Sequence, residues 1–98
     1  MHEHYPLFSQ VALSQDFPEY NLHWGDIATV VEYYQMTEQE DGYSLEGFNI
    51  PEITLEVAHS QIISISQWQK EQEIFQKIHK LSPEKLQELD QYINQLIA

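Results

Sequence analysis

Residues 27–36, IATVVEYYQM, constrain the fold more than any other part of the chain. The run is dense in β-branched and aromatic residues, which fit the pleated surface of a strand better than a helix. It leads into TEQEDGY, in which Asp41-Gly42 is a strong hairpin signal. The sequence therefore predicts a strand that turns back at residues 41–42 into a second, antiparallel strand.

Other segments in the first two-thirds of the chain have β patterns too. Residues 7–14 form an apolar run, residues 53–58 alternate apolar with polar side chains, and Ile62, Ile63 and Ile65 predict a last short strand. Gly47 indicates a bulge or a sharp bend of the kind that small barrels use at their corners. We therefore expect a small SH3-like β-barrel of about five strands.

The pattern changes at Ser66, because from there on the chain has no glycine and its apolar residues recur at helical spacing. Ser66 with Gln69 makes a capping-box pattern, and Ser82-Pro83 places a good N-cap residue before a first-turn proline. These signals predict two helices, at about 67–80 and 83–97. The expected fold class is mainly β with an α tail.

Charge separates an expected barrel at 1–65 from an expected tail at 66–98. The chain has sixteen acidic and four basic residues. The first part holds eleven acids and no lysine or arginine, whereas the tail holds five acids and all four lysines, so their formal charges are −11 and −1. Nucleic acids and anionic membranes are bound by cationic side chains, so we expect neither as a partner. An acidic barrel favours a basic protein partner. The alternative is that the acidic residues only keep the protein soluble.

Several classes of protein are disfavoured by what the sequence lacks. There is no cysteine, which excludes disulfides, thiolate metal sites and thiol nucleophiles. The N-terminal residues do not have the pattern of a signal peptide, and no apolar run approaches the ~20 residues of a membrane span. We expect a cytoplasmic protein.

A resemblance to a known family rests on the stretch VALSQDFPEYNLHWGDIATVVEYYQ. It resembles a bacterial family, common in cyanobacteria, that is described only as a domain of unknown function (DUF4926). The resemblance covers roughly residues 5–65 and implies an SH3-like barrel without any catalytic residue. Residues 78–96 are similar to short helical segments of bacterial antitoxins, which suggests a neutralising role. The residues that carry the first resemblance are Val11, Leu13, Asp16, Pro18, Glu19, Leu22, Gly25, Asp26, Thr29, Val30, Val31, Glu32, Tyr43, Leu45 and Glu46.

No arrangement of residues predicts a metal site or an active site. His2 and His4 flank Glu3, but they lie next to a chain terminus, and the other three histidines are scattered without metal-ligand spacing. Carboxylates are so abundant that pairs of them carry no information about acid–base catalysis. No catalytic or nucleotide-binding motif is present. We expect neither a cofactor nor enzymatic activity.

Two features suggest a surface for a partner. Adjacent Tyr33 and Tyr34 must point to opposite faces of their strand, so one of them lies outside the core. An apolar stripe on the second expected helix can be covered by the barrel, by a second copy of the chain or by a groove in a different protein. The candidate partner-binding residues are Tyr34, Glu38, Glu40 and Asp41 near the hairpin, and Leu86, Leu89, Ile93 and Leu96 in the stripe.

These observations give two expected functions. The first is a non-catalytic, antitoxin- or inhibitor-like module that binds a basic protein, such as a toxin encoded nearby, through its acidic barrel and its C-terminal helix. The alternative is a homo-oligomeric structural or assembly protein, with a homodimer joined through the second helix and an acidity that serves only solubility.

Overall fold

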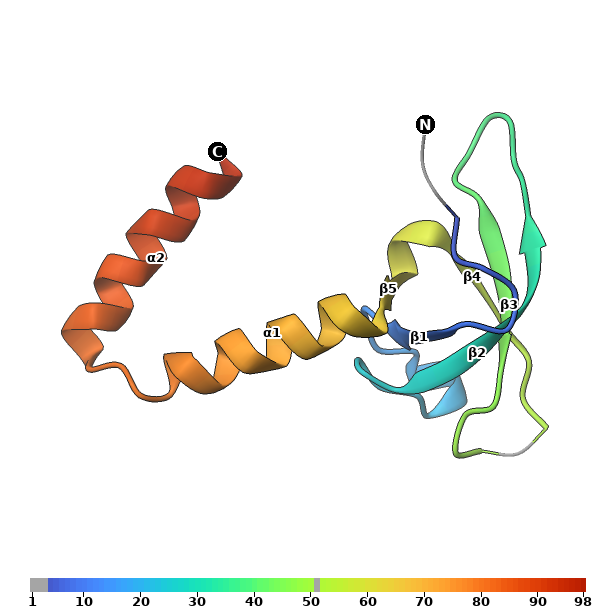
Figure 1. The fold of residues 1–98 in the computed structure, drawn as a ribbon, viewed down its shortest axis with the longest axis horizontal. Helices are drawn as coiled ribbons and strands as arrows, with labels where there is room; N and C mark the ends of the chain where they lie inside the picture. The colour runs from blue at the N-terminus through green and yellow to red at the C-terminus, as the bar shows by residue number, and fades with distance from the viewer. Residues whose placement is uncertain (1–3, 51) are drawn as a thin grey trace. The chain divides into compact units, whose positions relative to one another are not determined.

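The computed structural model describes residues 4–50 and 52–98, which form a five-stranded sheet followed by two α-helices (Figure 1). This confirms the expected fold class, mainly β with an α tail. The chain divides into two compact units, residues 1–68 and 69–98. The elements in chain order are β1 (Gln10–Leu13), the 3₁₀ helix η1 (Pro18–Tyr20), β2 (Ile27–Tyr34), β3 (Gly42–Glu46), β4 (Leu55–Ala58), the 3₁₀ helix η2 (His59–Gln61), β5 (Ile62–Ser64), α1 (Ile65–Ile78) and α2 (Pro83–Ile97).

The sheet is antiparallel throughout, with the strand order β4-β3-β2-β1-β5. β4 and β5 are its two edges, although η2 joins them directly in the chain (Figure 1). The expected number of strands is confirmed. Among the described residues the sheet is open, so the closure of these strands into a barrel stays a prediction.

One face of the sheet carries the hydrophobic core. Its largest fully buried side chains are Val11, Leu13, Val30, Tyr43 and Leu45, which come from the three central strands. Residues from the loops and the edge strands complete the core: Phe17, Leu22, Ala28, Phe48, Leu55, Val57 and Ile62. The outer face of β2, β3 and β4 is therefore free to carry polar side chains.

A β-bulge in β2 decides which side chains reach that core. Val30 pairs with Leu45 and Glu32 pairs with Ser44, so Val31 is an extra residue without a partner on β3. An extra residue shifts the in–out alternation of a strand by one position. As a result Tyr33 packs against the core beside Tyr43, and Glu32 is exposed on the outer face.

The turn between β2 and β3 differs from the predicted one. Asp41-Gly42 is not a two-residue turn, because Gly42 is the first residue of β3 and pairs with Tyr34. The connection is the loop 35–41, which ends at Asp41. Directly after β3, Gly47 has a φ of +89°, a backbone conformation that favours glycine, and the chain bends at residues 49–50.

The two predicted helix starts have different outcomes. α2 begins as expected, since the Ser82 hydroxyl accepts a hydrogen bond from the backbone N–H of Lys85 at 3.3 Å. The capping box at Ser66 is wrong, because α1 already begins at Ile65. Ser64, the last residue of β5, accepts from the N–H of Gln67 instead, at 3.1 Å. With no loop between β5 and α1, the cap moves to the end of the strand.

Gly25 holds the start of α1 against the loop before β2. Gly25 has a φ of +93°, and a Cβ atom at this position would overlap the indole ring of Trp68. Trp68 also meets the Trp24 ring edge to face, with ring centroids 6.0 Å apart. The absence of a side chain at Gly25 therefore permits both the positive φ of the backbone and the close contact with Trp68.

Replacing Gly25 by alanine should lower the free energy of unfolding by about 2 kcal/mol or more, from backbone strain and overlap with Trp68. Gly42→Ala is the matched control, because Gly42 has no positive φ and its Cβ would meet Val57 at an ordinary 3.5 Å. The control should be neutral or stabilising by up to about 1 kcal/mol. Urea unfolding of both variants checks this, and equal destabilisation would contradict it.

Candidate functional site

The loop between β2 and β3 is held in place by the carboxylate of Asp41. Its two oxygens accept hydrogen bonds from the Tyr33 hydroxyl at 2.7 Å and from the backbone N–H of Met36 at 3.1 Å. These bonds join Asp41, the last residue of the loop, to Tyr33 in β2 and to Met36 near the start of the loop. Asp41, a predicted partner-binding residue, therefore has an internal structural role.

Glu40 braces the same loop from the other side. Its carboxylate accepts from the backbone N–H of Ser60 at 2.7 Å and from the Ser60 hydroxyl at 3.0 Å. Ser60 lies in η2, so this pair ties the loop 35–41 to the turn between β4 and β5. Of the three acids predicted near the hairpin, Glu38 is exposed, whereas Glu40 and Asp41 make these internal hydrogen bonds.

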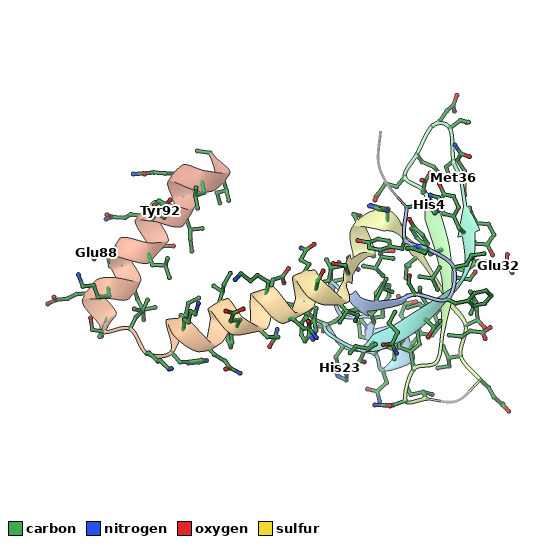
Figure 2. The ribbon with its side chains drawn as sticks, viewed as in Figure 1. His4, His23, Glu32, Met36, Glu88 and Tyr92 are labelled. Atoms are coloured by element: carbon green, nitrogen blue, oxygen red, sulfur yellow. The ribbon has the colours of Figure 1, made fainter. Side chains whose placement is uncertain are left out.

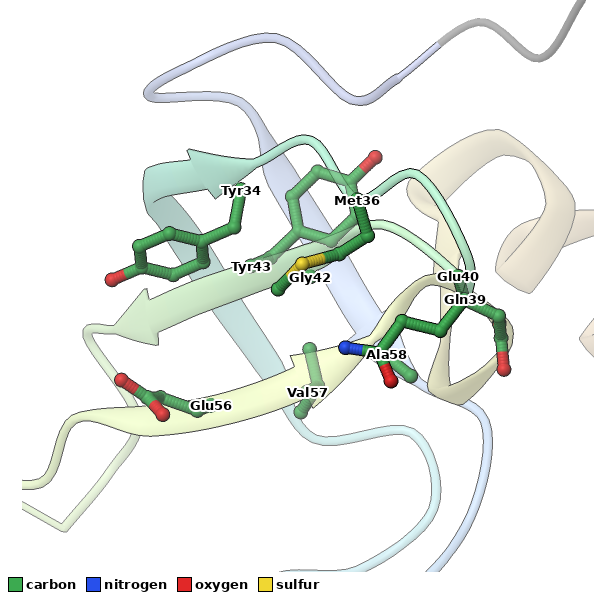
Figure 3. Close-up of a pocket in the computed structure, with 9 residues that line it drawn as sticks. All are labelled: Tyr34, Met36, Gln39, Glu40, Gly42, Tyr43, Glu56, Val57 and Ala58. Atoms are coloured by element: carbon green, nitrogen blue, oxygen red, sulfur yellow. The ribbon is translucent and has the colours of Figure 1, made fainter.

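A hollow lies on the outer face of the sheet beside this loop, and we call it the hairpin hollow (Figure 3). Its volume is about 500 Å³, and a second cavity of about 400 Å³ shares Met36, Gln39 and Glu40 with it. Gly42 and Ala58 pair across β3 and β4, and because both are small they leave space above the sheet. The remaining lining residues are Tyr34, Tyr43, Glu56 and Val57.

The structure places Tyr34 at this hollow, on the face opposite to Tyr33. Its hydroxyl lies 2.8 Å from that of Ser44, which explains how Ser44 is buried on the outer face of the sheet. The prediction that one of the two tyrosines lies outside the core is confirmed. Tyr34 thus offers its ring to the hollow while its hydroxyl is already engaged.

Three further carboxylates share the outer face with Tyr34: Glu32, Glu46 and Glu56. Glu32 and Glu56 lie on opposite sides of Ser44 in one cross-strand row, and Figure 2 shows Glu32 at the outer side of the sheet. All three side chains are exposed, and Glu46 accepts a hydrogen bond from Thr54 at 2.8 Å. We call these three residues the acidic outer face. They are not among the predicted partner-binding residues, although the alternation Leu55-Glu56-Val57 indicated an outward Glu56.

An aromatic cluster lies behind the hollow, on the core side of the sheet. The His4 ring stacks on Tyr33 with centroids 4.1 Å apart, and the Tyr43 hydroxyl lies 3.1 Å from Nδ1 of His59. Tyr5 donates its backbone N–H to the Tyr43 oxygen at 3.1 Å. Burial raises the pKa of both Tyr5 and Tyr43, so these phenols stay neutral at physiological pH. Tyr5 and Tyr43 therefore contribute to this cluster as neutral rings that pack edge to face, with centroids 5.6 Å apart.

Other aromatic residues and the N-terminal histidines do not add a further site. Tyr43 and Phe48 are core residues, whereas Trp24 is half exposed. His2 and Glu3 lie outside the described residues, and His4 stacks on Tyr33. Within residues 4–50 and 52–98, no group of three or more His, Cys, Asp or Glu side chains is placed to hold a metal ion.

Comparison with known proteins places this sheet in a family. The family model for a domain of unknown function (DUF4926) matches residues 7–59, more than half of the 98-residue chain. The chain belongs to the DUF4926 family. The comparisons found no matching curated protein and no matching solved structure.

The match confirms the resemblance inferred from the sequence and defines its extent. The DUF4926 segment includes β1, β2, β3 and β4 and therefore the hairpin hollow and the acidic outer face. It ends at the start of η2, so both α-helices lie outside it. The likeness of residues 78–96 to antitoxin segments stays a prediction.

The predicted apolar stripe lies on α2, outside the DUF4926 segment. Neither α1 nor α2 contains a buried residue, and Leu86, Ile93 and Leu96 are among the exposed large apolar side chains, with Leu89 half exposed. Figure 2 shows Glu88 and Tyr92 together on one side of α2. No helix in the described part of the chain has both the length and the apolar character needed to cross a membrane.

The hydrogen bond between Tyr33 and Asp41 makes the stability of this DUF4926 sheet depend on pH. It holds the pKa of the Asp41 carboxyl below its usual value, with help from the Met36 N–H, and it raises the pKa of Tyr33 to about 12. Asp41 stabilises the fold above the ordinary aspartate pKa of ~3.9, and this stability is lost as the pH falls through its lowered value. Tyr33 contributes fully below its ordinary pKa of ~10, and that contribution is lost as the pH rises towards 12.

We therefore expect Asp41→Asn to be less stable than the natural chain at pH 7, by a margin that shrinks below about pH 4 as the natural carboxylate becomes protonated. Glu38→Gln, which removes an exposed acid of the same loop, should show little change at either pH. Urea unfolding between pH 2.5 and 7 measures both differences. A margin for Asp41→Asn that stays constant over this range would contradict the assignment.

Proposed function

We propose that this chain is a non-catalytic module that binds a basic protein, in the manner of an antitoxin or an inhibitor. One observation carries the proposal: the acidic outer face exposes three carboxylates in a part of the chain, residues 1–65, that contains no lysine or arginine. No lysine or arginine of that part can neutralise the face. A surface of one charge attracts oppositely charged partners and raises their rate of association.

The α2 stripe supplies the second contact in this proposal. An amphipathic helix of 15 residues gains most of its stability from packing its apolar face against another surface. Leu86, Leu89, Ile93 and Leu96 recur at alternating spacings of three and four residues, which places them on one side of α2. We propose that they enter an apolar groove of the same basic partner.

A non-catalytic role is supported by what the polar groups near the hollow do. Glu40 and Asp41 accept hydrogen bonds that hold the loop, and the Tyr34 hydroxyl is engaged with Ser44. The description of the DUF4926 family names no activity. The carboxylates of Glu40 and Asp41 therefore have a structural role in this proposal, because they hold the loop beside the hollow.

A self-assembling protein is the second candidate, because the same spacing is typical of a two-stranded coiled-coil seam. In that case α2 would pair with α2 of a second copy. Sedimentation at several concentrations tests it, since a dimer joined through only 15 residues should dissociate on dilution.

A matched pair of α2 variants tests the proposed function. Leu89→Glu/Ile93→Glu adds two charges to the stripe, and Gln91→Glu/Gln95→Glu adds the same two charges to exposed polar positions of α2. Co-expression with the product of the adjacent gene, pull-down and mass spectrometry should recover a stoichiometric basic protein with the natural chain. The stripe variant should weaken this complex at least about thirtyfold, and the control less than about threefold.

Two results would count against the proposed function. Recovery of a partner with an acidic isoelectric point would contradict the role of the outer face. The other result is a natural chain that is recovered without a partner and forms a dimer. If the stripe variant raises the dissociation constant of that dimer and the control variant does not, the self-assembling candidate is established instead.

A further inference from the structure

β4 is an edge strand, and its pairing with β3 shows which of its backbone groups are free. The N–H of His59 donates to the carbonyl of Asp41 at 2.9 Å, so residues 59 and 41 form a hydrogen-bonded pair. In an antiparallel ladder such pairs alternate with non-hydrogen-bonded ones. Leu55 and Val57 therefore bond to β3, whereas the backbone groups of Glu56 and Ala58 point to the free edge.

The protein itself occupies one end of this edge. The N–H of Ala58 donates to the side-chain oxygen of Gln61 at 2.8 Å, which agrees with its outward direction. For Glu56, no backbone hydrogen bond outside the β3–β4 ladder is found within the described residues. Its N–H and C=O together are the donor and acceptor that an added antiparallel strand needs.

The side chain of Glu56 lines the hairpin hollow directly beside this free backbone (Figure 3). Tyr34 and Met36 form apolar walls of the hollow, over the small residues Gly42 and Ala58. An aliphatic stem with a cationic end fits such a space, because the stem packs on Tyr34 and Met36 and the charge faces the carboxylate and the aromatic ring.

Charge at the edge also selects the kind of strand that can be added. If two copies of β4 paired around this position, Glu56 would lie opposite Glu56, and like charges directly opposite each other destabilise a strand pair. A strand with lysine or arginine at that position makes a favourable pair instead. Edge strands that carry charge commonly avoid self-association in this way.

We propose that an extended basic segment of the partner adds to β4 as an antiparallel strand, with a lysine or arginine opposite Glu56 and its side chain in the hairpin hollow. This inference rests on the proposed function and gives the form in which the basic partner is recognised. The residue opposite Glu56 exchanges both backbone hydrogen bonds with it, and its side chain lies on the same face of the sheet. The recognised segment is therefore one in which cationic residues alternate with others.

A peptide titration tests the proposal on the full chain. The probe is a fluorescein-labelled heptapeptide of alternating lysine and valine, and fluorescence anisotropy reports its binding. Methylation of the backbone nitrogens of the lysines should abolish binding, because the N–H groups of those residues face β4. Methylation of the backbone nitrogens of the valines should change the dissociation constant less than about threefold, because those N–H groups face away. A peptide with glutamate in place of lysine should not bind.

Protein variants separate the site from general charge attraction. Glu56→Lys should weaken binding of the lysine peptide at least about fivefold, and Glu19→Lys, the same change at an exposed position in η1, less than about twofold. Amide hydrogen exchange should slow at Glu56 when the peptide is added and stay unchanged at Val57. Equal effects of the two variants, or equal effects of the two N-methylated peptides, would overturn the proposal.

The failure of this inference can be told apart from the failure of the proposed function. If Glu56→Lys and Glu19→Lys affect peptide binding equally but the stripe variant still loses a basic partner, then the edge proposal fails and the proposed function stands. If no basic partner is recovered while the peptide results hold, then β4 recognises basic strands and the edge proposal stands, but the proposed function fails.

Discussion

The bulge at Val31 is the feature on which the rest of the sheet depends. Without an extra residue, the alternation that buries Ala28 and Val30 would continue to Glu32 and Tyr34. The core would then receive a carboxylate, and Tyr33 would leave its contact with Tyr43. With the bulge, one strand supplies an aliphatic pair to the core before Val31 and an aromatic ring after it, and the outer face receives Glu32 and Tyr34.

The carboxylates around the hairpin fall into two groups with different physical roles. Glu40 and Asp41 are engaged with hydrogen-bond donors of the chain itself, so they fix the loop, and Asp41 gives the sheet its pH dependence. The acidic outer face carries exposed charge next to a hollow and a free strand edge. The first group ties the loop to β2 and to η2, beside the hollow. Of the second group only Glu56 lines the hollow, and in our proposal it is the residue that faces the cationic end of a partner side chain.

Local patterns predicted the elements of this fold well but not the placement of the site. The β-rich run at 27–36, the cap at Ser82-Pro83 and the stripe on α2 depend on residues close in sequence, and the structure has them where expected. The Asp41-Gly42 signal predicted that Glu38, Glu40 and Asp41 lie beside a hairpin turn. It did not reveal that Asp41 accepts a hydrogen bond from Tyr33 across the loop, because residue spacing alone does not show such a contact. Glu32 belongs to the outer face only because of the bulge, which has no marker such as glycine in the sequence. The hollow depends on Gly42 meeting Ala58, a pairing between distant segments.

The central claim is that Val31 is unpaired and reverses the alternation within β2. Cross-strand nuclear Overhauser effects between backbone protons of the isotope-labelled full chain test it most directly. The structure predicts that Val30 lies opposite Leu45 and that Tyr33 lies opposite Tyr43, with no partner for Val31. A continuous register, with Val31 opposite Ser44 and Glu32 opposite Tyr43, would contradict the claim and remove Glu32 from the acidic outer face.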